Sequence, residues 1–321
     1  MKAIVYTRHG SPENLQLKEV DRPLLKENHL LIKVHAASLN ALDSHLMNGM
    51  PLIDWLFRPT PKIPGVDLAG TVEAIGSAVT RFKAGDEVFG NGHGAFAEYS
   101  LAPERALALK PANVSFEAAA AVPVAALTAL QGLRDHGEIK PGQKVLIHGA
   151  GGGVGTFAVQ IAKLLGAEVT ALCSTRNLEM ARSIGADHVI DYTQQDYTRS
   201  GKRYDLIMAV NGYHPISAHR RALAPRGILV MAGASKAHIF KAMFQSFLLG
   251  PLISMTGKQR FRLFIARIKE ADLLFLSGLL ATGRLKPVID RQYPLSEAAD
   301  AMRYLEQWHS GGKVIITVVP G

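Results

Sequence analysis

The run HGAGGGVG at residues 148–155 constrains the fold more than any other feature, because it places five glycines in eight positions. It follows the apolar run KVLI at 144–147 and precedes the helix-like stretch TFAVQIAKLLG at 156–166. A strand, a glycine-rich turn and a helix in this order form the fingerprint of a dinucleotide-binding βαβ unit. We therefore predict a doubly wound parallel sheet that binds a dinucleotide. The alternative is a glycine-rich turn without a ligand.

In register, the fingerprint reads A-x-G-x-x-G, with alanine at the usual first glycine position. The second glycine lets the backbone approach a pyrophosphate, and the third permits close packing of the helix on the strand. The free N–H groups and the positive dipole end of the helix N-terminus also favour phosphate. The residues of this loop predicted to bind the cofactor are Ala150, Gly151, Gly152, Gly153, Val154 and Gly155.

The choice between the two nicotinamide dinucleotides depends on the next strand, which ends in LCSTRN at residues 172–177. An NAD site has an acidic residue here, about 20 residues after the glycines, and this sequence has none. Ser174 and Arg176 can instead donate hydrogen bonds to a 2′-phosphate, and Tyr192 after the third strand can add a hydroxyl. The local alternatives are a helix N-cap for Ser174 and a solvated loop arginine for Arg176. We predict NADP(H) as the cofactor.

The pattern of the chain changes near residue 120. Before it, short β-rich runs alternate with Gly, Pro and Asp turns, and after it Val/Ile/Leu-rich strands alternate with helical stretches. The final run GGKVIITVV is predicted to be a strand that rejoins the first part. We therefore predict one mostly-β domain from residues 1–120 and 270–321, and one α/β domain from residues 121–269.

Composition excludes several classes of protein. The single cysteine, Cys173, rules out an internal disulfide framework and a cluster of thiolate zinc ligands. The formal net charge of +9 is spread over scattered cations without interleaved aromatic residues, so nucleic-acid binding is not expected. Neither a secretory leader nor a run of roughly 18 apolar residues is found, and we expect a soluble cytoplasmic protein.

Several motifs together carry a family resemblance: SLNALDSHLMNG, PGVDLAGTVEAIG, FKAGDEVFG, GAFAEY and GAGGGVG. In this order and spacing they resemble the zinc-independent quinone oxidoreductase branch of the medium-chain dehydrogenase/reductase superfamily. Within that branch the chain is similar to the chloroplast-envelope quinone oxidoreductase homologues. The resemblance implies a GroES-like, mostly-β catalytic domain beside a Rossmann domain, with the active site in the cleft between them.

The same resemblance implies that no catalytic zinc is bound. Asn40 stands at the position of the catalytic cysteine of the zinc enzymes, and residues 65–67, Gly-Val-Asp, stand at their Gly-His-Glu segment. Catalytic zinc needs three protein ligands, and these residues do not supply them. Asp43 is expected to fix the surrounding segment by hydrogen bonds.

Three further residues complete the candidate site. Asn40 is the candidate catalytic residue, because the resemblance places it beside the nicotinamide ring, where its amide binds substrate or cofactor; the alternative is a turn asparagine that bonds to local backbone. Thr128 resembles a nicotinamide contact, with a helix-interior threonine as the alternative. Gly233, at the end of the run GILVMAG, completes the cofactor-binding residues.

Without a metal to polarise a carbonyl, hydride addition to a conjugated system is the more plausible chemistry. We expect NADPH-dependent reduction of quinones or of α,β-unsaturated carbonyls. The alternative function is that of a sensory or regulatory NADPH-binding protein of the same fold. By analogy with the family, a homodimer would form through edge strands of the Rossmann sheet, with GILVMAG extending the sheet.

Residues 236–269 hold seven Lys/Arg and no Asp/Glu. In their second half, four apolar residues follow the i, i+3, i+4, i+7 spacing of a helix, with cations on both edges. These four are Phe261, Phe264, Ile265 and Ile268. The predicted amphipathic helix either packs on the sheet or lines the substrate cleft, or it binds an anionic membrane surface peripherally.

Overall fold

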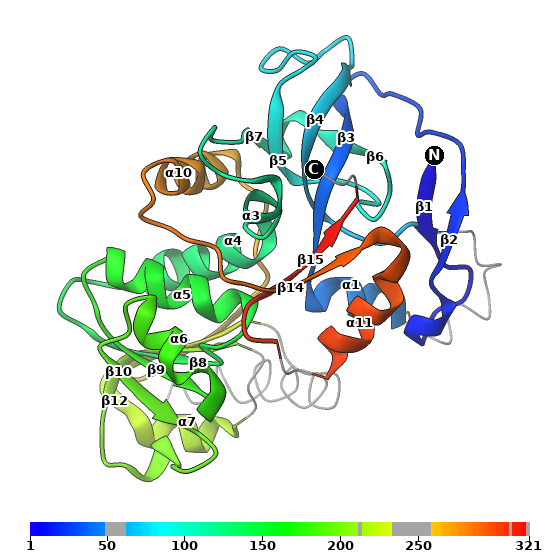
Figure 1. The fold of residues 1–321 in the computed structure, drawn as a ribbon. Coiled ribbons are helices and arrows are strands. Elements are labelled where there is room, and N and C mark those ends of the chain that lie inside the picture. The colour runs from blue at the N-terminus through cyan, green and yellow to red at the C-terminus, as the bar shows by residue number, and fades with distance from the viewer. Residues whose placement is uncertain (49–61, 211–213, 233–257, 308–309, 319–321) are drawn as a thin grey trace. The chain divides into compact units, whose positions relative to one another are not determined.

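The computed structural model describes residues 1–48, 62–210, 214–232, 258–307 and 310–318. The chain divides into two compact units (Figure 1). The first unit comprises Met1–Ala125 and Ile268–Gly321, and the second comprises Ala126–Arg267. These divisions lie within five residues of the boundaries predicted at 120/121 and 269/270.

The second unit is built on one sheet of six parallel strands. Its strands are β8 (Lys144–His148), β9 (Glu168–Cys173), β10 (His188–Asp191), β11 (Tyr204–Val210), β12 (Leu223–Ala232) and β13 (Arg260–Phe264). Their spatial order is β10-β9-β8-β11-β12-β13, so the direction of strand addition reverses between β8 and β11. In such doubly wound sheets, ligands bind beyond the carboxyl ends of the strands at this reversal.

Helices connect strands of this sheet (Figure 1). They are α5 (Gly153–Leu164), α6 (Leu178–Ser183) and α7 (Ile216–Ala222), with short turns at Gly132–His136, Thr175–Asn177 and Tyr197–Arg199. Helix α5 buries the apolar residues Phe157, Ala158 and Ile161, which recur at helical spacing. Helix α4 (Pro123–Gln131) crosses the boundary between the two units.

The amphipathic helix predicted over residues 261–268 is wrong. Residues Arg260–Phe264 form β13, which pairs in parallel with β12. Arg260 and Arg262 also form ion pairs with Glu138 at 2.9 and 2.6 Å. Strand β13 pairs with β12, so the described residues 227–232 of the run GILVMAG lie in an interior strand and not at the sheet edge that a dimer would extend.

The first unit is built on a seven-stranded sheet in the order β14-β15-β3-β4-β5-β7, with β6 paired to β3. Its strands are β3 (His29–Leu39), β4 (Asp67–Ile75), β5 (Glu87–Asn91), β6 (Tyr99–Pro103), β7 (Leu107–Leu109), β14 (Ile289–Pro294) and β15 (Lys313–Thr317). The orange and red C-terminal strands lie beside the blue β3 (Figure 1). The antiparallel pairing of β15 with β3 confirms that the last strand rejoins the first part of the chain.

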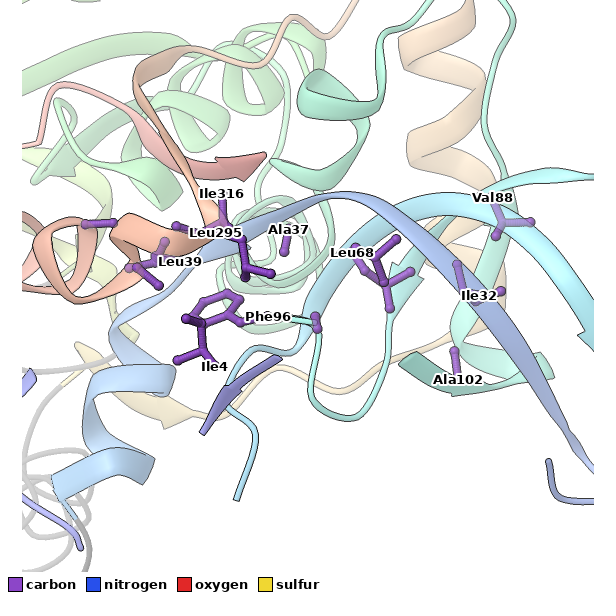
Figure 2. Packing of buried hydrophobic residues seen from close by; sticks show 14 of the residues in the cluster. Ile4, Ile32, Ala37, Leu39, Leu68, Val88, Phe96, Ala102, Leu295 and Ile316 are labelled. Carbon is purple, nitrogen blue, oxygen red and sulfur yellow. The ribbon is translucent and has the colours of Figure 1, made fainter. Parts of the chain in front are cut away.

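Among the described residues, a hairpin and four further α-helices complete the first unit. The hairpin pairs β1 (Lys2–Val5) with β2 (Gln16–Glu19), and the helices are α1 (Ala41–Asn48), α3 (Phe116–Ala120), α10 (Glu270–Ala281) and α11 (Ala298–Glu306). Figure 2 shows the core, where Ile4, Phe96 and Leu295 meet side chains of β3 and β4. Among the helices that the structure describes, none has the length and apolar character needed to cross a membrane.

Candidate functional site

The glycine loop between β8 and α5 contains glycines that the second unit itself requires. Gly149 has φ +87°, and a Cβ there would collide with the carbonyl oxygen of Val210. A Cβ at Gly155 would collide with the backbone of Gly149 and Ala150, so the third glycine permits close packing of α5 as predicted. A Cβ at Gly151 would collide with the side chain of Asn177.

Gly152 differs from these three, because the protein's own packing leaves room for a side chain there. The nearest atom to a Cβ at Gly152 is the carbonyl oxygen of Gly149 at 3.7 Å, and the backbone of Gly152 (φ −87°, ψ 175°) suits any residue. The open space lies at the N-terminus of α5, whose first helical bond is Thr156 N to Gly152 O at 2.9 Å. A glycine that packing does not require fits a loop that a pyrophosphate approaches closely.

The backbone around Gly152 also suits an anion. The N–H groups of Gly153, Val154 and Gly155 precede the first helical donor and have no acceptor within α5. Ala150 is buried, and its N–H donates to Leu172 O at 3.1 Å, which ties the loop to β9. The residues present therefore fit a dinucleotide phosphate.

The loop after β9 carries the residues predicted to bind a 2′-phosphate. Ser174 lies at the N-cap position of the turn Thr175–Asn177, yet its side chain caps no backbone N–H. Its Oγ instead accepts a bond from Asn177 Nδ2 at 3.4 Å. Arg176 is exposed, and Tyr192 on the loop after β10 is 54% exposed. All three side chains follow the carboxyl ends of two neighbouring strands.

Two further predicted contacts have different outcomes. Thr128 is half-buried in α4, so it occupies the helix-interior position that was its alternative reading; its contact with nicotinamide stays a prediction. Gly233 lies outside the described residues.

A buried polar cluster in the first unit surrounds Asp67, and we call it the Asp67 network. The Asp67 carboxylate is fully buried at the start of β4. It accepts hydrogen bonds from four donors. They are Ser38 Oγ at 3.2 Å, Asn40 Nδ2 at 2.9 Å, Asn91 Nδ2 at 2.8 Å and the backbone N of Val124 at 3.1 Å.

Lys313 on β15 supplies the cation of this network. Its Nζ lies 3.7 Å from Asp67 Oδ2 and donates to Asn40 Oδ1 at 2.7 Å and to Leu39 O at 2.9 Å. Burial lowers the pKa of Lys313 and raises that of Asp67, while their mutual attraction opposes both shifts. Four donors and an ammonium group around one carboxylate favour the ionised pair.

Asp43 fixes the start of α1, as predicted from the sequence. Its Oδ2 accepts the backbone N–H of Asn40 at 2.8 Å, while its Oδ1 is buried without a hydrogen-bond partner. Burial is the largest influence and raises the pKa of Asp43 to about 7; the neighbouring Asp67 raises it further, while the Asn40 N–H and Lys313 lower it. Asp43 is therefore a buried acid that titrates near neutrality.

The Asp67 network engages both ends of the Asn40 amide. Besides Asp67, Nδ2 lies 3.5 Å from Ser38 O, and Oδ1 accepts from Lys313. The Asn40 side chain therefore bonds to Asp67 and Lys313 as well as to local backbone, which goes beyond the alternative of a turn asparagine. The sequence did not reveal the part played by Lys313; the signal was a single cation at the start of the apolar run KVIITVV.

The second unit holds a buried histidine cluster that the sequence did not predict. Tyr197 OH lies 2.7 Å from His219 Nδ1, and the rings of His148 and His214 lie 5.8 and 5.9 Å from that of His219. Burial, more than the neighbouring His214, lowers the pKa of His219 to about 3. These histidines are neutral near pH 7. Across the described ranges, no three His, Cys, Asp or Glu side chains are grouped so as to hold a metal ion.

Comparison with known proteins adds to this geometry. Residues 26–112 match the family described as "Alcohol dehydrogenase GroES-like domain", and residues 184–316 match "Zinc-binding dehydrogenase". The chain is 36% identical to the "Chloroplast envelope quinone oxidoreductase homolog" of Arabidopsis thaliana, over 98% of each chain. It is 34% identical to the "NADPH-dependent alkenal/one oxidoreductase, chloroplastic" of the same plant, over 100% of this chain and 80% of that protein.

A solved structure agrees with these relatives. The quinone oxidoreductase of Escherichia coli, complexed with NADPH, is 27% identical and superposes with a TM-score of 0.86 over 99% of this chain and 100% of that chain. The fold is accordingly a GroES-like domain together with a Rossmann domain, as predicted. The chain belongs to the quinone oxidoreductase group of the medium-chain dehydrogenase/reductase superfamily.

Proposed function

We propose that this protein is an NADPH-dependent oxidoreductase that transfers hydride to quinones or to α,β-unsaturated carbonyl compounds. The observation that carries the proposal is the glycine loop, where Gly152 leaves open space at the N-terminus of α5. The loop after the following strand, β9, carries Ser174 and Arg176 and has no carboxylate between residues 174 and 177. NADP(H) is therefore the cofactor, in agreement with the relatives named for NADPH.

The relatives also indicate the class of substrate. Their names cover quinones and alkenals or alkenones, which share a carbon–carbon double bond conjugated to a carbonyl group. When bound, NADPH supplies a hydride for the electrophilic carbon of such a system, and the resulting charge spreads onto oxygen. The protein's task is to bind and orient the two reactants and to exclude water around them.

Asn40 acts as a hydrogen-bond acceptor in this account. Its Nδ2 is directed at Asp67 and Ser38, whereas its Oδ1 accepts one bond, from Lys313, and retains a second lone pair. An amide held in this way accepts from the carboxamide of a nicotinamide more readily than it donates to a substrate oxygen. We therefore assign Asn40 to the cofactor rather than to the substrate oxygen.

Zinc independence also belongs to the proposal. Asn40, Val66 and Asp67 stand where the zinc enzymes carry ligands, and the Asp67 carboxylate already binds four donors and lies beside Lys313. The ammonium group of Lys313 already pairs with the Asp67 carboxylate, and it would repel a metal ion at this position. Activity is expected to survive prolonged chelation, and stoichiometric zinc in elemental analysis of tag-free protein would contradict this part.

The remaining features stay predictions. A homodimer would pair an edge strand, and the edges among the described strands of the second unit are β10 and β13. Contact with an anionic membrane now rests only on the charge of residues 236–269, because the predicted helix is replaced in part by β13. A cytoplasmic location rests on the sequence alone.

The test is turnover. Purified protein is mixed with NADPH and a panel of quinones, alkenals and alkenones, and cofactor oxidation and reduced product are quantified together. We expect stoichiometric conversion of at least one compound class, with the carbon–carbon double bond as the reduced bond for enones. Tight NADPH binding without turnover of any compound would favour the sensory alternative.

A further inference from the structure

Two loops of the second unit are joined by side chains at the carboxyl ends of neighbouring strands. Strands β9 and β10 pair in parallel with Asp191 opposite Cys173, and a loop leaves each strand at that point. Thr175 Oγ1 on the first loop donates to Asp191 Oδ2 at 2.5 Å. The same hydroxyl lies 3.2 Å from Thr193 Oγ1 on the second loop.

Asp191 also organises its own loop. Its Oδ1 accepts the backbone N–H of Thr193 at 2.9 Å and the hydroxyl of Thr193 at 2.7 Å. We call Thr175, Asp191 and Thr193 the Asp191 brace. Hydrogen bonds from Thr175 and Thr193 lower the pKa of Asp191, so its carboxylate is ionised near neutrality.

The brace is offset by one residue from the side chains assigned to the 2′-phosphate. Thr175 stands between Ser174 and Arg176, and Tyr192 stands between Asp191 and Thr193. The brace residues bond to one another across the two loops, while Arg176 and Tyr192 between them are exposed. Neither of these two exposed side chains forms a hydrogen bond or an ion pair with another described residue.

We propose that the Asp191 brace is the positioning element of the 2′-phosphate site, holding the loops after β9 and β10 together so that Ser174, Arg176 and Tyr192 form one site. This inference rests on the proposed function, because it assumes that NADPH is the cofactor. Two exposed loops that are already fixed lose less conformational freedom when a ligand binds, and the affinity is correspondingly higher. The benefit applies to the 2′-phosphate and hence to NADPH rather than NADH.

The charge of Asp191 makes the proposal easy to separate from simple electrostatics. An anion at the edge of a phosphate site repels the phosphate, so charge alone predicts that Asp191→Ala tightens NADPH binding. The brace predicts the opposite, because loss of the carboxylate releases both loops. The sign of the change in affinity therefore decides between the two accounts.

The experiment measures dissociation constants for NADPH and NADH with the full-length protein, together with its melting temperature. Thr175→Val removes the donor at unchanged charge and nearly unchanged volume, and Thr175→Ser retains the donor. The matched control is Thr198→Val, because Thr198 Oγ1 donates to Asp196 Oδ1 at 2.7 Å in a similar turn that carries no predicted phosphate contact.

For Thr175→Val and Asp191→Ala we expect the dissociation constant of NADPH to rise about fivefold to twentyfold, with less than about twofold change for NADH. Thr175→Ser and Thr198→Val should keep the wild-type ratio of the two constants. Equal weakening of both cofactors, or tighter NADPH binding by Asp191→Ala, overturns the brace. If the wild type itself binds both cofactors equally, the assignment of NADPH fails first and the brace fails with it.

Discussion

Lys313 Nζ donates to Asn40 Oδ1 at 2.7 Å, although 273 residues separate the two in the chain. The bond joins the C-terminal strand β15 to the residue that follows β3, next to the start of α1. Asn40 is thereby held by a cation that is itself paired with the buried Asp67.

Removal of either member of the Lys313–Asp67 pair should destabilise the first unit. Lys313→Met leaves the Asp67 carboxylate buried without its cation, which costs about 3 to 5 kcal/mol of unfolding free energy. Asp67→Asn leaves the ammonium group equally uncompensated. In a double-mutant cycle by chemical denaturation, the unfolding free energy of the double variant should fall by clearly less than the sum of the decreases in the two single variants. Strict additivity would show that the pair is not coupled.

Asp43 should make the first unit less stable as the pH rises. Its folded pKa of about 7 lies above the value of about 3.8 in the unfolded chain, so between these values the folded state binds more protons. Stability present at low pH is therefore lost as the pH rises toward 7. Asp43→Asn removes this dependence, and its unfolding free energy relative to wild type should rise by about 2 to 3 kcal/mol from pH 5 to pH 8. A constant difference between the two proteins would contradict the assignment.

His219 should have the opposite effect in the second unit. Its folded pKa of about 3 lies below the unfolded value of about 6.5, so the unfolded state binds more protons in this window and stability falls as the pH falls below 6.5. His219→Asn keeps an acceptor for Tyr197 but does not titrate there. From pH 7 to pH 5, the unfolding free energy of the wild type should therefore fall by about 2 kcal/mol relative to that of His219→Asn. The control is His93→Asn, because His93 is exposed, and it should not reproduce this change.

Two glycines of the cofactor loop should respond differently to alanine. Gly149→Ala forces a side chain into the left-handed region and against Val210 O, so it should destabilise the protein by at least about 2 kcal/mol. Gly152→Ala should leave stability within about 1 kcal/mol, because its backbone and surroundings accept a Cβ. The same alanine should weaken NADPH binding at least about tenfold by blocking the pyrophosphate. Unchanged affinity would show that the phosphate does not approach Gly152.

The sequence predicted those parts of the fold that depend on neighbouring residues. The strand, glycine turn and helix at 144–166 follow one another directly, and apolar spacing within each element was sufficient to identify it. Residues 260–264 were assigned wrongly, because Phe261 and Phe264 fit helical spacing while their strand conformation depends on pairing with β12, which no local pattern reports.

The candidate site likewise contains residues that the sequence could predict and residues that it could not. The phosphate residues lie in short loops beside the strands that position them, so their grouping follows from the order of elements along the chain. The hydrogen bonds that Asp67 and Lys313 form in the Asp67 network instead join residues separated by 24 to 274 positions, and each polar side chain alone looks ordinary in the sequence. The Asp191 brace also depends on the register between β9 and β10, which the sequence does not specify.

The central claim, that NADPH is the cofactor of this protein, is tested most directly by the dissociation constants of NADPH and NADH for wild type and Arg176→Ala. The account predicts that wild type binds NADPH more tightly. Loss of the guanidinium removes charge-assisted bonds to the 2′-phosphate and should weaken NADPH roughly thirtyfold or more. NADH, which has no 2′-phosphate, should change less than about threefold. Equal constants for the two cofactors in the wild type, or equal weakening of both by Arg176→Ala, would contradict the account.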